Sequence, residues 1–177
     1  MVPTNLYGPR DHFDPESSHV IPALVRKFLE ARESGGDVTV WGTGKPTRDF
    51  LYVGDCVEAL LKAGELLLGG PYNVGSGREV SIAELNQLVA KATGYRGHVA
   101  FDASKPDGQP RRVLDSSKFM ELTGWEPEVT LEAGLARTVA WYVTECRKDA
   151  GASEGPLTRA IAKAKGMRAP SGALPSV

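Results

Sequence analysis

The sequence has little of what marks several large classes of protein. Its only two cysteines, Cys56 and Cys146, lie 90 positions apart, which argues against a disulfide framework and against a zinc site. No apolar run approaches the ~20 residues that a membrane span needs, and the first 30 residues lack the charged-then-apolar order of a signal peptide. These absences predict a soluble cytoplasmic protein without a metal or a membrane partner.

An excess of charge of one sign is also missing. The 21 basic and 22 acidic residues give a net charge of −1, which argues against electrostatic binding to nucleic acid. Residues 147–177 depart from this balance with six basic and two acidic residues, and they are rich in Gly, Ala, Pro and Ser. We expect a flexible basic tail with at most one short helix near 157–166, and a solvated tail is favoured over a membrane- or nucleic-acid-binding one.

The remaining composition is that of a globular protein. A length of 177 residues with 41% hydrophobic residues suits one domain followed by a tail. Helical and extended segments alternate along residues 1–146, which indicates an α/β architecture. The expected helices are 21–32, 55–65, 82–93, 117–123 and 131–146, and the expected strands are 38–41, 50–53, 72–74 and 98–101. Predicted helix caps are Asp55, Ser81 and Thr130, with Gly94 as a helix end.

Three segments carry side chains suited to a polar ligand. Arg48 follows the glycine-rich turn 41–47, where an arginine can bind phosphate in bidentate fashion, although such a turn is usually a surface hairpin. The loop 105–112 contains two adjacent arginines, and a solvated turn is its simpler interpretation. His19 lies just before a helix, where a histidine is more often a cap or a surface residue than a catalyst.

Taken in chain order, these segments resemble the extended short-chain dehydrogenase/reductases of the NAD-dependent epimerase/dehydratase family. The resemblance is carried by residues 3–9, 19–24, 40–44, 48–55, 72–77 and 101–108. It covers residues 1–146 and is most specific for the GDP-L-fucose synthases, which are NADPH-dependent 3,5-epimerase/4-reductases acting on GDP-4-keto-6-deoxymannose. It implies the end of a Rossmann domain together with a small α/β substrate-binding region in 1–146.

Several hallmarks of that family are absent. The sequence has no glycine-rich dinucleotide fingerprint and no Tyr-x-x-x-Lys pair, and neither Cys56 nor Cys146 matches the family's epimerase cysteine. We therefore expect this chain to correspond to the carboxy-terminal half of such an enzyme. It would then lack the main binding site for NADP(H) and be inactive on its own.

The resemblance also assigns roles to individual residues. His19 matches the general acid/base histidine that serves epimerisation at carbons 3 and 5 of the sugar, and this role is favoured over capping. The positions that match the nicotinamide side of the cofactor site are Pro3, Thr4, Asn5 and Leu6, together with His19. The positions that match substrate contacts are Lys27, Trp41, Arg48 and Asp107, with Arg112 as a weaker addition.

Two other functions stay open. The chain could be a non-catalytic module that binds a sugar nucleotide, or part of another nucleotide-sugar epimerase or dehydratase. The loop 105–108 and His19 favour a GDP-sugar as the substrate over the second of these. Members of the family are commonly homodimers, so the resemblance implies a homodimer for the complete enzyme.

Overall fold

A computed structural model describes residues 1–152, with side chains described for residues 1–145. Its helices are α1 (Val20–Ser34), α2 (Val53–Glu65), α3 (Ile82–Thr93), α4 (Ser117–Thr123) and α5 (Leu131–Ala152). Its strands are β1 (Val2–Pro3), β2 (Asn5–Tyr7), β3 (Val38–Trp41), β4 (Thr47–Arg48), β5 (Phe50–Tyr52), β6 (Asn73–Val74), β7 (Val80–Ser81), β8 (Val99–Asp102) and β9 (Arg111–Arg112). The last helix continues six residues past its predicted end, and the helix expected near 157–166 lies outside the described residues.

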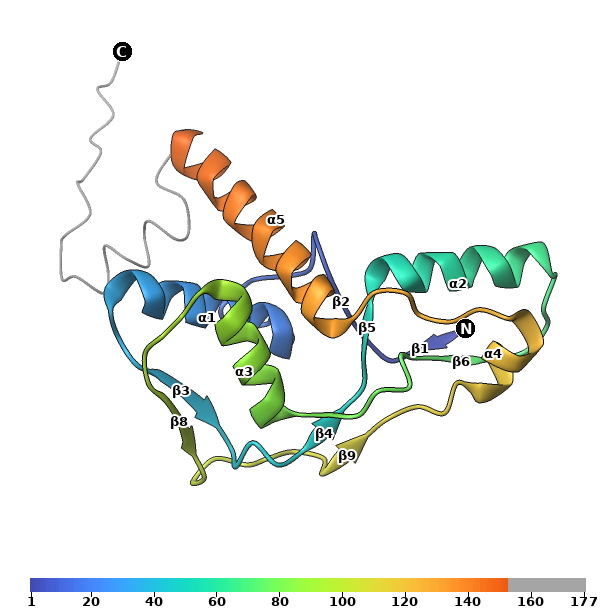
Figure 1. Cartoon of the computed structure of the whole chain (residues 1–177), viewed down its shortest axis with the longest axis horizontal. Coiled ribbons are helices and arrows are strands. Elements are labelled where there is room, and N and C mark those ends of the chain that lie inside the picture. The colour runs from blue at the N-terminus through green and yellow to red at the C-terminus, as the bar shows by residue number, and fades with distance from the viewer. Residues whose placement is uncertain (153–177) are drawn as a thin grey trace, which may run out of the picture.

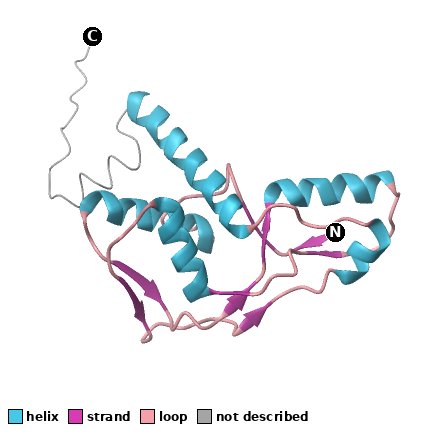
Figure 2. Ribbon diagram, viewed as in Figure 1, coloured by secondary structure: helices cyan, strands magenta, loops and turns pink. Residues whose placement is uncertain are grey.

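The strands form small sheets in which parallel pairing dominates (Figure 2). The pairs β1–β6, β2–β5 and β3–β8 are all parallel, and β4 lies between antiparallel β7 and parallel β9. Parallel partners need long crossover connections, which here contain helices. The predicted α/β fold class is therefore confirmed.

Two apolar cores hold the elements together. Helices α1, α3 and α5 pack against one another on one side of β2 and β5 (Figure 1), where Phe28, Leu85 and Leu135 are fully buried. On the other side, α2 and α4 enclose a second core that contains Phe119 and Trp125. The buried residues of α1 and α3 recur at helical spacing, as the sequence predicts for these two helices.

The predicted caps have mixed outcomes. The Ser81 hydroxyl accepts a hydrogen bond from the Glu84 amide at 3.1 Å, Thr130 accepts one from the Ala133 amide, and Gly94 ends α3 with a left-handed backbone. The prediction for Asp55 was wrong. The N-cap of α2 is Tyr52, three residues earlier, and the buried Asp55 carboxylate instead accepts a hydrogen bond from the amide of Val129. A contact 74 residues away in sequence outweighs the local signal.

The glycine-rich turn 41–47 does not form a hairpin. Strand β3 pairs with β8, whereas β4 pairs with β7 and β9, so the turn connects two different sheets. Gly42 and Gly44 both have positive φ angles, and a Cβ atom at Gly44 would overlap the ring of Phe101. The two glycines let the chain cross from one sheet to the other at close range.

Candidate functional site

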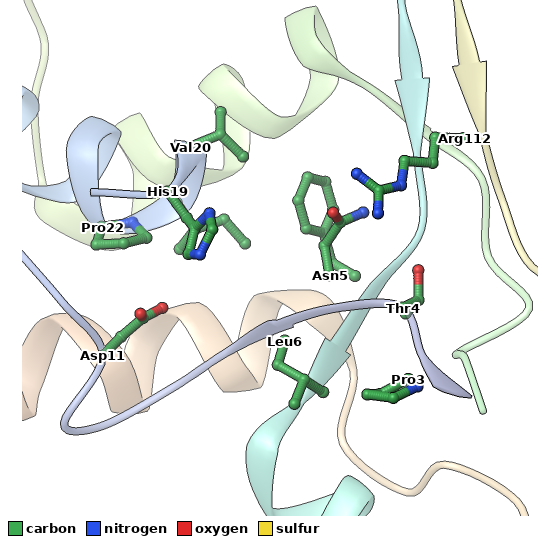
Figure 3. Close-up of a pocket in the computed structure, with 11 residues that line it drawn as sticks. Pro3, Thr4, Asn5, Leu6, Asp11, His19, Val20, Pro22 and Arg112 are labelled. Atoms are coloured by element: carbon green, nitrogen blue, oxygen red, sulfur yellow. The ribbon is translucent and has the colours of Figure 1, made fainter. Parts of the chain in front are cut away.

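A pocket of about 450 Å³ lies where the start of α1 faces β2 and β9 (Figure 3). It is lined by Pro3, Thr4, Asn5, Leu6, Asp11, His19, Val20, Ile21, Pro22, Phe50 and Arg112. Every residue predicted on the nicotinamide side of the cofactor lines this pocket, and so does one predicted substrate contact, Arg112. Segments more than 100 residues apart in sequence thus share one cavity.

His19 occupies the N-cap position of α1 but does not cap the helix. Its backbone is extended, and its side chain makes no hydrogen bond to the first turn. The side chain is exposed and lines the pocket, with its ring projecting from the start of α1 in Figure 3. The alternative interpretation of His19 as a side-chain cap was wrong, and its imidazole is available to a ligand in the pocket.

Thr4 and Asn5 form a fixed wall of the pocket. The Thr4 hydroxyl and the Asn5 side-chain amide both donate to the backbone carbonyl of Asp49, at 3.1 and 2.8 Å. The Thr4 amide donates to the carbonyl of Val74 at 2.9 Å. These bonds hold Thr4 and Asn5 in place and leave the Oδ1 of Asn5 as an acceptor for a ligand, beside the apolar Pro3 and Leu6.

Arg112 and Arg48 are register partners on the parallel strands β9 and β4. The side chain of Arg112 is exposed and lines the pocket, and in Figure 3 its guanidinium points toward Asn5. Arg48 does not line the pocket, and its Nη1 donates to the carbonyls of Thr47 and Gln109, each at 2.7 Å. The residue predicted as the weaker contact is therefore the one at the cavity.

Trp41 and Asp107 form a second group outside the pocket. The Asp107 carboxylate accepts hydrogen bonds from the amide and the hydroxyl of Thr43, at 2.6 and 2.8 Å, and these bonds lower its pKa. The ring of Trp41 is 68% exposed, and the ammonium of Lys105 lies 5.8 Å from its centre. This exposed flat ring beside a cation can stack on a planar group.

Lys27 forms a hydrogen bond to strand β3, which also carries Trp41. Its ammonium donates to the carbonyl of Thr39 at 2.7 Å, and its pKa is lowered, first by burial and then by the nearby Arg26. Lys27 does not line the pocket. The bond to the Thr39 carbonyl uses one of the three ammonium donors of an exposed side chain, so the other two are left for a ligand.

The sequence analysis missed several residues of the pocket. Phe50 and Pro22 supply apolar surface, and Asp11 supplies a carboxylate whose Oδ2 is buried and unpartnered within the described residues. Asp11 follows Arg10, which has a positive φ of 67°. Strained backbone of this kind collects at functional sites, but the torsion angle cannot be read from the sequence.

The described residues show no site of two other kinds. Within residues 1–152, no group of three or more His, Cys, Asp or Glu side chains is placed to hold a metal ion. None of the helices in that part of the chain combines the length and apolar character that a membrane crossing requires.

The chain is similar to known proteins of one family. Residues 1–75 match the NAD dependent epimerase/dehydratase family. The chain is 51% identical over 144 residues to the probable GDP-L-fucose synthase 1 of Oryza sativa, covering 80% of this chain and 44% of that protein. It is 48% identical over 154 residues to the GDP-L-fucose synthase of Escherichia coli, covering 81% and 48%. The matched region belongs to the NAD dependent epimerase/dehydratase family.

Solved structures of that family share the fold. A GDP-L-fucose synthetase from Naegleria fowleri superposes with a TM-score of 0.75 at 34% identity, covering 80% of this chain and 44% of that one. A second structure of that protein, bound to NADP, gives the same TM-score. A UDP-glucose 4-epimerase from Thermotoga maritima superposes with a TM-score of 0.68 at 33% identity, covering 81% and 45%. The chain thus spans about half the length of the relatives it matches.

Proposed function

We propose that this chain carries the sugar-nucleotide-binding region of an enzyme of the GDP-L-fucose synthase type, with GDP-4-keto-6-deoxymannose as the substrate. The observation that supports this most is the pocket itself, which places the uncapped imidazole of His19 in one cavity with Asn5 and Arg112. Relatives named GDP-L-fucose synthases, 48–51% identical over most of the chain, support the choice of GDP-sugar.

The proposed chemistry uses His19 as an acid. Protons on carbons 3 and 5 of the sugar are acidic because both carbons neighbour the ketone at carbon 4. Epimerisation requires loss of a proton from one face and its return from the other, which takes two groups on opposite sides of the sugar. His19 is proposed to return the proton. Its exposed position at the pocket and its freedom from helix capping leave it able to do so.

Phosphate binding is assigned to the arginines of β4 and β9. A guanidinium presents paired donors that match phosphate oxygens. Arg112 reaches the pocket directly, and the Nε and Nη2 of Arg48 make no hydrogen bond within residues 1–152. Trp41 and Asp107 are proposed to contact the nucleoside, with the Trp41 ring stacking on a flat base.

The pocket fits only one end of NADP(H). Pro3, Leu6 and Phe50 give it apolar walls beside polar ones, which suits the flat nicotinamide ring. The sequence contains no glycine-rich turn of the dinucleotide-binding type, so nothing in this chain matches a cradle for the pyrophosphate. When bound, the cofactor supplies a hydride to the ketone. We expect this chain by itself to show no steady oxidation of NADPH.

The decisive experiment is a calorimetric titration of the 177-residue chain with GDP and, in parallel, with UDP. The proposal expects GDP to bind more tightly than UDP and Arg112→Ala to weaken GDP binding. Equal affinity for both nucleotides would favour another nucleotide-sugar epimerase or dehydratase. The similarity to UDP-glucose 4-epimerase is the observation that supports this alternative. Failure of both to bind would reject the proposal. A His19→Gln chain that binds GDP normally would agree with a role in proton transfer alone.

A further inference from the structure

Asp49 lies between the segment that carries Thr4 and Asn5 and the strand that carries Arg112, and it does not line the pocket. It is the single residue between β4 and β5, and its side chain is fully buried. Its carbonyl accepts the hydrogen bonds from Thr4 and Asn5, and its amide donates to the carbonyl of Arg112 at 3.2 Å. One residue thus connects the segment that carries Thr4 to the strand that carries Arg112.

The Asp49 side chain is itself fixed from a third direction. Its Oδ1 accepts hydrogen bonds from the hydroxyl and the amide of Ser76, at 2.5 and 3.1 Å. Ser76 follows Val74 closely, and the carbonyl of Val74 holds the amide of Thr4. The hydrogen bonds among Thr4, Asp49 and the 74–76 segment therefore form a closed ring, in which the Asp49 side chain supplies the link to Ser76.

Gly75 lets this ring close. A Cβ atom at Gly75 would overlap Oδ2 of Asp49 and would lie 3.3 Å from the hydroxyl oxygen of Ser116. Both Oδ2 of Asp49 and the Ser116 hydroxyl are buried without a hydrogen-bond partner in the described residues. An asparagine at position 49 would keep the Oδ1 acceptor for Ser76 at nearly the same volume, so Asp49→Asn is a conservative replacement.

We propose that Asp49 is a positioning residue that sets Arg112 relative to Thr4 and Asn5, and so gives the pocket the geometry in which it binds the sugar nucleotide. This inference rests on the proposed function for the identity of the ligand. The link that Asp49 makes between Arg112 and the segment of Thr4 and Asn5 does not depend on that identity, because it follows from hydrogen bonds within the protein. Asp49 acts through Arg112 and does not itself touch the ligand.

Hydrogen exchange of the ligand-free chain tests directly whether Asp49 holds these segments together. In Asp49→Ala, and more weakly in Ser76→Ala, peptides covering 2–7, 47–52 and 110–114 should exchange at least tenfold faster than in the unaltered chain. Helix α3 should keep its protection, and Asp49→Asn should restore slow exchange. As a matched control, Thr93→Val removes a buried hydroxyl that donates to the carbonyl of Val89 within α3. Unchanged exchange in the three peptides of Asp49→Ala would overturn the proposal, whether or not GDP binds.

A double-mutant cycle on GDP affinity separates positioning from general loss of stability. Asp49→Ala should weaken binding about tenfold in the unaltered chain and less than twofold in an Arg112→Ala background, while Thr93→Val leaves affinity unchanged. Additive losses, or equal losses in Asp49→Ala and Thr93→Val, would overturn the positioning role. If the unaltered chain binds no GDP while exchange responds as expected, the proposed function is wrong, but the result supports the role of Asp49 in linking these segments.

Discussion

Tyr7 on β2 packs directly against the backbone of Gly134 in the first turns of α5. The Tyr7 ring is 2% exposed, and a Cβ atom built on Gly134 would overlap the Tyr7 hydroxyl and ring carbons. The hydroxyl is also near the carbonyl of Leu131, at 3.5 Å, and burial raises the pKa of Tyr7 well above its ordinary value. The absence of a side chain at Gly134 is therefore what lets α5 approach the pocket strand.

Gly134→Ala should destabilise the protein although alanine is the better helix former. Alanine gains about 1 kcal/mol in helix propensity, whereas overpacking a filled site costs about 1–3 kcal/mol, and the buried Tyr7 has no room to move. Urea unfolding should show a net loss. Gly64→Ala in α2 is the matched control, because a Cβ atom there meets nothing within 4 Å. A stabilised Gly134→Ala would disprove the close approach.

His19 and Ser81 occupy the same N-cap position on α1 and α3, but only Ser81 makes a side-chain bond to its helix. Ser81→Ala should lower the free energy of unfolding by about 1 kcal/mol. His19→Ala should change it by less than about 0.5 kcal/mol, as for a surface substitution. Chemical denaturation of both variants measures this difference. Equal losses would return His19 to a capping role.

Asp49 should make stability depend on pH. Burial raises the pKa of its carboxyl, and the hydrogen bonds from Ser76 oppose this only in part. The folded state therefore holds this proton more tightly than the unfolded chain. The contribution of Asp49 to stability is greatest below about pH 4, the ordinary pKa of aspartate, and falls as the pH rises through the raised value.

Asp49→Asn is the reference for that measurement. The free energy of unfolding of the unaltered chain minus that of Asp49→Asn should fall between pH 4 and neutral pH in a series of urea titrations. Taking the difference cancels the exposed carboxylates whose pKa values are lowered, such as Asp107 and Glu79. A difference that rises with pH would mean that hydrogen bonding outweighs burial.

Arg48→Ala should weaken GDP binding by about 1.5–3 kcal/mol if Arg48 binds the diphosphate, as expected for a hydrogen bond to a charged group. Arg96→Ala removes the same charge from an exposed position that does not line the pocket. Calorimetry on both variants separates a direct contact from a general change of charge. Equal affinity in Arg48→Ala and the unaltered chain would leave Arg48 with only its bonds to Thr47 and Gln109.

The sequence by itself determined most of the elements of this protein. Apolar spacing located α1 and α3, Ser81 with Glu84 located the start of α3, and Gly94 its end, because these signals act within a few residues of chain. The ordered motifs also led to the right family, since residues 1–75, which contain 3–9 and 48–55, match it. The assigned roles of the site residues stay predictions.

Only the tertiary structure decided how these elements meet. In the structure, Asp55 contacts Val129 and does not cap α2, and the turn 41–47 connects two sheets. Arg112 lines the pocket, whereas Arg48 does not. The linking role of Asp49 could not be predicted from the sequence, because its partners come from segments 27 to 63 positions away. Local propensity cannot encode such contacts: their free energy comes from burial and hydrogen bonds that exist only once distant segments have packed together.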